Sequence, residues 1–112
     1  MRIISTKITN NLSIVKFELD EFIIKTESFE FKNIDETKQS PLAKQLFFLP
    51  FVKTVYISGN FIAIEKFSIV EWEDVQDDVA NQINEFIANG GEILLIDETQ
   101  NKKQPITIYA ET

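Results

Sequence analysis

The residue types that most often perform chemistry in proteins are missing from this chain. Its 112 residues contain no cysteine and no histidine, so the strongest common nucleophile and the commonest general base are both absent. Ser40 precedes a helix-like run and Ser58 belongs to a turn, so each has a sufficient structural role. The glycines form no phosphate-binding loop of the Walker or dinucleotide type. We therefore predict that the chain is not an enzyme.

Carboxylates are the one reactive group that forms a dense cluster. Five of them occur within eight residues (Glu71, Glu73, Asp74, Asp77 and Asp78). Ca²⁺ and Mg²⁺ need several oxygens that converge on one point, usually from a loop, whereas these acids begin a helix-like segment and splay around it. We expect no metal ligands and no cofactor in this chain, so a small acidic cation-binding module or enzyme is the weakest alternative. We interpret Glu73, Asp74, Asp77 and Asp78 as a docking surface for a basic partner, because complementary charge steers association.

Aromatic residues form the second candidate surface. The run from Leu46 to Phe51 contains more large apolar side chains than one short helix can bury. Phe48, Phe51 and Phe61 are therefore candidate partner-binding residues, as members of an exposed apolar patch. The alternative is that the sheet or the tail of the chain covers them, and single exposed apolar residues are also ordinary.

The stretch 40–66 predicts a short helix followed by a β-hairpin. Ser40 is a favourable N-cap, and Pro41 suits the first helical position. Leucines then recur at helical spacing until Pro50 stops the helix. The β-rich runs 52–57 and 61–66 flank a Ser-Gly-Asn turn.

A long amphipathic helix is predicted from about Glu71 to Asn89. Its apolar stripe, at intervals of mostly three and four residues, consists of Trp72, Val75, Val79, Ile83, Phe86 and Ile87. Alternation predicts strands at 12–19 and 28–32, and a short apolar run predicts another at 93–96. The expected order of elements is β-β-α-β-β-α-β.

This order predicts an α+β fold, in which an antiparallel β-sheet is covered on one face by a short and a long α-helix. Residues 1–96 are expected to form the folded domain. Residues 97–112 are expected to form a polar loop and tail, of which 97–105 is expected to be a mobile loop. The end of that tail, 106–110, is either a last strand or part of a linker to a further domain.

The ordered series of motifs resembles the N-terminal domain of the Nfu proteins, which are NifU-related proteins of iron–sulfur cluster assembly. The resemblance rests on SPLA-x-x-LF from Ser40, Val-x-x-Val with an aromatic residue, a glycine turn, Phe-Ile with a lysine, and Glu71-Trp72 at the start of the long helix. NNLSIVKF from Asn10 is similar to the family's opening strand. The chain departs from the family in lacking the opening prolines, in having Phe51 where glycine is usual, and in having Ala63 where threonine is common.

The resemblance implies an interaction or spacing domain of an Nfu-type assembly protein. In that family a Cys-x-x-Cys on a separate C-terminal domain holds the cluster, and this chain has no such ligands. The implied partners are the cluster-bearing C-terminal domain and client apoproteins. The chain is then either a fragment of a longer protein, which we favour, or a stand-alone protein-interaction adaptor with the same fold.

Charge and composition narrow the class of partner and the expected location. The net charge is −7, and residues 67–101 contain nine acids and neither lysine nor arginine. Phosphate backbones and anionic lipids attract lysine and arginine, so nucleic acid and membranes are not expected partners. The lack of cysteine fits a reducing compartment, and no leader or membrane span is evident. We therefore expect a cytoplasmic protein.

Overall fold

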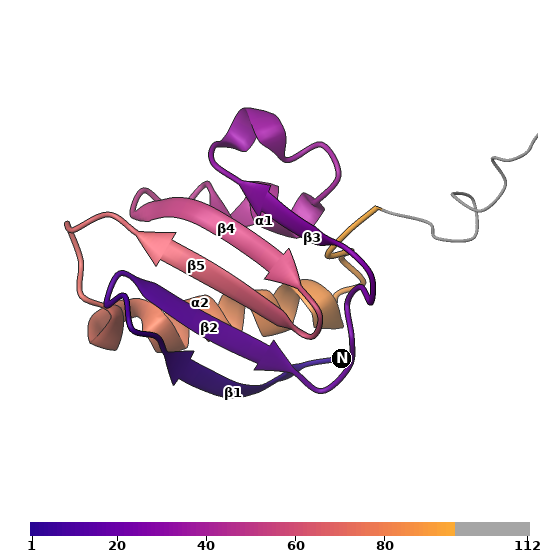
Figure 1. The fold of residues 1–112 in the computed structure, drawn as a ribbon, viewed down its shortest axis with the longest axis horizontal. Helices are drawn as coiled ribbons and strands as arrows, with labels where there is room; N and C mark the ends of the chain where they lie inside the picture. The colour runs from indigo at the N-terminus through magenta and orange to yellow at the C-terminus, as the bar shows by residue number, and fades with distance from the viewer. Residues whose placement is uncertain (96–112) are drawn as a thin grey trace, which may run out of the picture.

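The structure is a computed structural model that describes residues 1–95. Its elements in chain order are β1 (Ile3–Ile8), β2 (Ile14–Leu19), β3 (Ser28–Phe31), the 3₁₀ turn η1 (Ile34–Glu36), α1 (Pro41–Leu46), β4 (Val52–Ser58), β5 (Phe61–Lys66) and α2 (Trp72–Ala88). The five strands form one antiparallel sheet in the order β1-β2-β5-β4-β3. Figure 1 shows α2 running along the sheet from its start, on the left, to its end on the right, where the last described residues follow it.

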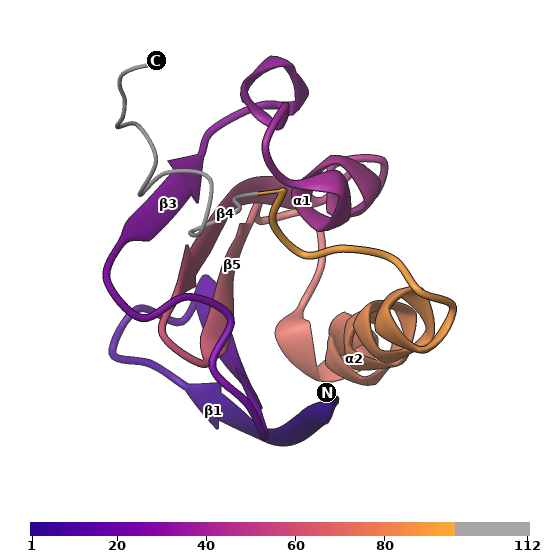
Figure 2. The ribbon, with the colours of Figure 1, turned by 90° about the vertical axis from the view of Figure 1, so that its right-hand side faces the viewer.

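Both helices cover the same face of the sheet, which confirms the predicted α+β architecture. Figure 2 shows α1 and α2 on one side of the strands; no helix of residues 1–95 lies on the other side. We call the covered side the inner face and the other side the outer face. No helix within residues 1–95 is long and apolar enough to cross a membrane.

Strand alternation sorts the side chains between the two faces. In β2, Val15, Phe17 and Leu19 are buried, and the residues between them are partly exposed. Ile62 and Ile64 of β5 pair with that strand and are also fully buried. The core then closes against buried residues of the helices, which are Leu42, Ala43 and Leu46 of α1 and Trp72, Val79 and Ile83 of α2.

Helix α1 begins as its sequence predicts. The Ser40 hydroxyl oxygen accepts a hydrogen bond from the Ala43 N–H at 2.9 Å, and Pro41 occupies the first helical position. The same hydroxyl donates to the Ile93 carbonyl oxygen at 2.7 Å. Ser40 is completely buried. Its hydroxyl therefore has two structural roles: it caps α1 and holds the segment after α2 by a hydrogen bond.

Helix α2 is anchored at its first residue. The Trp72 indole N–H donates to the Ser13 carbonyl oxygen at 2.8 Å. The indole also meets Phe17 and Phe51 in edge-to-face contacts, with ring centroids 6.0 and 6.4 Å apart. The predicted stripe is therefore correct in direction, although Val75, Phe86 and Ile87 are only partly buried.

The sequence analysis missed one strand and predicted another that does not form. Strand β1 was not predicted, because a register shift between Ile3 and Ser5 interrupts its alternation. The strand predicted at 93–96 does not form in its described part: the Leu95 N–H donates to the Gln39 carbonyl at 2.8 Å, and Ile93 accepts from Ser40. These bonds tie the segment to the loop before α1 and leave it unpaired with the sheet. Ile96, the predicted loop and tail 97–112, and the possible strand 106–110 lie outside the described residues.

Candidate interaction surfaces

The four predicted acidic docking residues lie together on the solvent side of α2. Glu73, Asp74, Asp77 and Asp78 are all exposed, while Trp72 and Val79 of the same turns are buried. None of the three ion pairs within residues 1–95 involves these four carboxylates. The N-cap residue Glu71 makes no side-chain capping bond, so the acids complement the positive end of a helix whose first N–H groups have no side-chain cap.

The acidic cluster does not resemble a metal centre. Within residues 1–95, no three or more aspartates, glutamates, histidines or cysteines lie close enough to hold a metal ion. Successive carboxylates on a helix point in different directions, and hard cations need oxygens that converge. What this arrangement offers chemically is an uninterrupted negative surface.

The structure does not bring the three candidate phenylalanines together. Phe48 is exposed on the loop between α1 and β4, whereas Phe51 on the same loop is partly buried against Trp72. Phe61 lies on the outer face, since its neighbour Ile62 points into the core. A single aromatic edge made of all three residues therefore does not exist.

Phe61 belongs instead to a small cluster on the outer face. Its ring lies 6.0 Å from that of Tyr56, and the Lys16 ammonium nitrogen is 4.3 Å from the Phe61 ring centroid. Two ion pairs, Lys7 with Glu18 and Lys53 with Glu65, cover neighbouring parts of that face. This face is mixed in charge and its aromatic rings already contact one another, so it has fewer free groups than the acidic side of α2.

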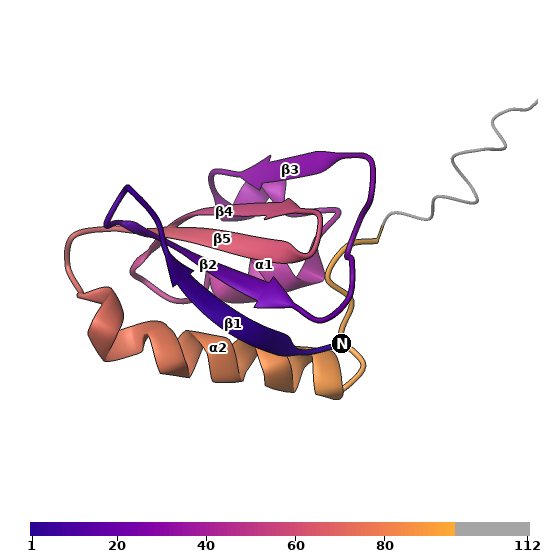
Figure 3. The same ribbon diagram turned by 60° about the horizontal axis from the view of Figure 1, so that its bottom comes forward.

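Exposed apolar residues gather at the end of the molecule where α2 begins, and sequence reasoning identified only one of them. Three loops meet there, 9–13 between β1 and β2, 47–51 between α1 and β4, and 67–71 between β5 and α2 (Figures 1 and 3). We call this the apolar loop end; its exposed members are Ile8, Leu12, Phe48, Phe67 and Ile69, with 46–79% of each residue exposed. The available signal was the presence of large apolar residues within loops, a position where the expected composition is polar.

Hydrogen bonds show that these loops are true neighbours. The Ser13 carbonyl oxygen accepts from the Lys66 N–H at 3.0 Å and from the Trp72 indole at 2.8 Å. The Phe67 N–H donates to the Phe51 carbonyl oxygen at 2.8 Å. The first turn of α2 is thus fixed against the loop that carries Leu12, which places the acidic residues beside the apolar ones.

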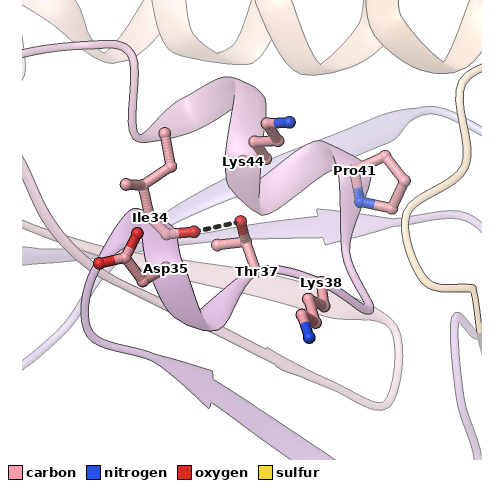
Figure 4. Close-up of a pocket in the computed structure, with 6 residues that line it drawn as sticks. All are labelled: Ile34, Asp35, Thr37, Lys38, Pro41 and Lys44. Carbon is pink, nitrogen blue, oxygen red and sulfur yellow. Dashed lines mark hydrogen bonds between the residues drawn. The ribbon is translucent and has the colours of Figure 1, made fainter.

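A shallow hollow of about 520 Å³ lies between η1 and α1. Figure 4 shows its lining residues, Ile34, Asp35, Thr37, Lys38, Pro41 and Lys44, with the Thr37 hydroxyl donating to the Ile34 carbonyl oxygen at 2.7 Å. The two lysines lie on different sides of the hollow and their ammonium groups do not converge. It contains neither a nucleophile with a base nor a set of ligands, so the acidic and apolar surfaces at the start of α2 are the stronger candidates.

Comparison with known proteins finds relatives over most of the chain. Residues 4–90 match the family model of the scaffold protein Nfu/NifU N terminal. A mitochondrial NFU1 iron–sulfur cluster scaffold homolog of Drosophila willistoni is 34% identical over 92 residues, which cover 81% of this chain and 32% of that protein. The chain thus spans about a third of the length of the curated relatives it matches.

Solved structures share the fold. The solution structure of a NifU-like protein from Saccharomyces cerevisiae is 26% identical, with a TM-score of 0.71, and the match covers 87% of this chain and 89% of that one. A crystal structure of a Staphylococcus aureus protein is 25% identical with a TM-score of 0.64, covering 74% of this chain and 99% of that one.

The relatives correct the expected location and identify the family. The Drosophila protein and its human and Arabidopsis thaliana counterparts are mitochondrial, so the cytoplasmic prediction was wrong. It rested on the lack of cysteine, which does not separate one reducing compartment from another, and on the lack of an evident leader or membrane span. The matched residues, the five-stranded sheet and its two helices together show that this chain belongs to the Nfu/NifU scaffold protein N-terminal family.

Proposed function

We propose that this chain is the interaction domain of an Nfu-type iron–sulfur cluster assembly protein and that it binds partners without ligating the cluster. The observation that carries this proposal is the row of four exposed carboxylates on the first turns of α2, opposite its buried stripe, none of which forms an ion pair within residues 1–95. Unpaired like charges on one helix face favour a partner of opposite charge. Membership of a scaffold family supports a binding role rather than a catalytic one.

The proposed partners are a cluster-bearing Cys-x-x-Cys domain of the Nfu family and the apoproteins that receive its cluster. Both follow from the family resemblance. The sequence supports the assignment of cluster ligation to the partner, because thiolates and imidazoles are the usual ligands of iron–sulfur clusters and none occurs in these 112 residues. The domain would hold the cluster-bearing partner near its client and leave the chemistry to them.

A titration tests the interaction. We would add an Nfu Cys-x-x-Cys domain, with and without its cluster, to the isotopically labelled chain and follow amide shifts and association rates at low and high salt. The expected result is a shift of α2 amides near Asp74, Asp77 and Asp78, with association that slows as salt screens exposed charges over about 10 Å at 0.1 M.

Charge reversal makes that test specific. The triple variant Asp74→Lys, Asp77→Lys, Asp78→Lys leaves the buried stripe intact and should slow association and reduce its salt dependence. The control is Glu85→Lys, an exposed acid near the other end of α2, which should change the rate much less. An unchanged rate and salt dependence in the triple variant would remove the acidic side of α2 as the interface.

Reconstitution tests the other half of the proposal. The purified chain, incubated with iron, sulfide and a reductant, should show no stoichiometric cluster absorbance, because no thiolate is available. A cluster that remains bound to the protein through gel filtration would contradict the proposed lack of ligation.

A stand-alone adaptor is the second candidate, and one observation favours it. The Staphylococcus aureus structure is matched over 99% of its length, so this fold occurs there as a chain with almost nothing added. An adaptor would bind a cluster-bearing protein in trans. Binding of a separately purified Cys-x-x-Cys domain with micromolar or better affinity would favour the adaptor, whereas binding only when the two are joined would favour a tethered domain.

A further inference from the structure

The apolar loop end adjoins the acidic start of α2. The Trp72 indole binds the loop that carries Leu12, and Asp74 and Asp77 lie on the next turns of the same helix. The three loops contain no lysine or arginine. Two lysines adjoin members of the apolar loop end in sequence: Lys7, next to Ile8, forms an ion pair with Glu18, and Lys66, next to Phe67, is buried with its ammonium nitrogen 3.5 Å from the Phe67 carbonyl oxygen. The surface is therefore apolar on one side and negative on the other.

The apolar part of this surface has the exposure expected of an interface. Ile8, Leu12 and Ile69 are each at least two-thirds exposed. A monomer can tolerate single exposed apolar residues, but grouped ones with a polar rim mark binding sites. Ile8 ends strand β1, and Leu12 and Ile69 sit on loops that backbone hydrogen bonds hold in place, so binding would not need to order them first.

Charge decides what kind of molecule fits. A second copy of the chain, related by two-fold symmetry, would place like carboxylates against each other across the same patch. An anionic membrane would be repelled by the same acids. A segment with apolar residues on one side and lysine or arginine on the other would satisfy both halves of the surface at once.

We propose that the apolar loop end and the adjoining acids Glu73, Asp74, Asp77 and Asp78 form a single docking site for a basic amphipathic segment of a partner protein. The inference rests on the proposed interaction role and specifies its surface and the chemistry of its partner. The apolar side of the segment packs on Leu12, Phe67 and Ile69, and its basic side faces α2.

A synthetic peptide serves as the probe. We would use a helix-forming peptide of about four turns, with leucines along one face and lysines along the other, and measure its binding to the full chain by calorimetry and amide shifts. A matched peptide with glutamates in place of the lysines tests the charge, and one with serines in place of the leucines tests the apolar contact. The lysine–leucine peptide should bind at the loop end, and each matched peptide should bind at least about fivefold more weakly.

Paired variants of the chain locate the site. Leu12→Ser and Ile69→Ser change exposed loop residues, so the fold should persist, and each should weaken the peptide at least about fivefold. The control is Phe22→Ser, which is also 60% exposed but lies on the β2–β3 connection at the opposite end of the sheet, beside the Gly59 turn. That control should change the affinity by less than about twofold.

The outcomes separate this inference from the proposed function. Four results would each overturn the docking site: equal weakening by Phe22→Ser, binding of the glutamate peptide as tight as that of the lysine–leucine peptide, co-sedimentation with phosphatidylcholine vesicles, or a dimer that Ile69→Ser dissociates. If the Cys-x-x-Cys domain binds and Leu12→Ser and Ile69→Ser leave that binding unchanged, the proposed function stands and the docking site fails. If the peptide binds at the loop end and the Cys-x-x-Cys domain does not bind, the docking site stands and the proposed partner is wrong.

Discussion

The two sides of α2 differ in what they contribute to the molecule. One side buries Trp72, Val79 and Ile83 against the sheet, and the other presents Glu73, Asp74, Asp77 and Asp78 to solvent. Burying a large apolar side chain contributes roughly 1.5–3 kcal/mol, whereas an exposed charge contributes less than about 1 kcal/mol. One helix therefore supplies stability and association through separate sets of residues, and substitutions should be able to change one property without the other.

The largest effect is expected on the buried side. Ile83→Ala should lower the free energy of unfolding by about 2–5 kcal/mol, because Ile83 is fully buried and the lost atoms leave a cavity. Urea denaturation measures the change. The control Asn81→Ala alters an exposed position of the same helix and should lie within about 0.5 kcal/mol of the original chain. Similar losses in both variants would contradict the division of α2 into two sides.

A smaller loss of stability is expected at Gly91, just after α2, which packs against the Phe86 ring of that helix. A Cβ atom added at Gly91 would approach the Phe86 ring to 2.5 Å, so Gly91→Ala must displace the ring and should cost about 1–3 kcal/mol. In a chain that already carries Phe86→Leu, Gly91→Ala should cost less than it does in the original chain. Thermal unfolding of the original chain, the two single variants and the double variant would measure this difference. Strictly additive effects would show that the ring does not restrict Gly91.

The next effect concerns the connection between α2 and α1. Ser40→Ala removes the acceptor for the Ala43 N–H and the donor to the Ile93 carbonyl, and we expect a loss of about 0.5–2 kcal/mol. Ser68→Ala, at an exposed loop position, is the matched control and should be nearly neutral. Hydrogen exchange should also rise at Leu95, whose N–H binds the adjacent Gln39; unchanged exchange there would argue against a fastening role for Ser40.

The smallest effect on stability is expected on the acidic side. Glu73→Ala or Asp77→Ala should change the free energy of unfolding by less than about 1 kcal/mol, since exposed charges near a helix start contribute little. The same variants should nevertheless slow association with a basic peptide. Unchanged association together with a large loss of stability would reverse the roles assigned to the two sides.

The parts of the fold that were predicted correctly are those whose signals are local. The Ser40 cap with Pro41, the hairpin turn at Gly59 and the stripe of α2 each depend on residues a few positions apart, and all three form as expected. Gly59 has a φ of +55°, a backbone conformation that favours glycine.

The parts that were missed depend on contacts distant in sequence. Strand β1 exists because β2 pairs with it across a register shift. The run at 93–95 includes Ile93, which is buried in the core. Its backbone groups bond to Ser40 and Gln39 and not to a strand, so it does not join the sheet. The candidate site shows the same limit. The acids were found from one segment, whereas the apolar loop end depends on three loops that only the folded sheet brings together.

The hydrogen bond between Leu95 and Gln39 determines where any downstream polypeptide begins its path. Helix α2 has 17 residues, so its end, a few residues before Leu95, lies about 25 Å from its start at the apolar loop end. A flexible tether would need about eight extended residues to cover this distance, and the local concentration of whatever it carries would depend on its length and stiffness. Shortening or stiffening such a tether would therefore adjust occupancy of the docking site without altering a single contact in it.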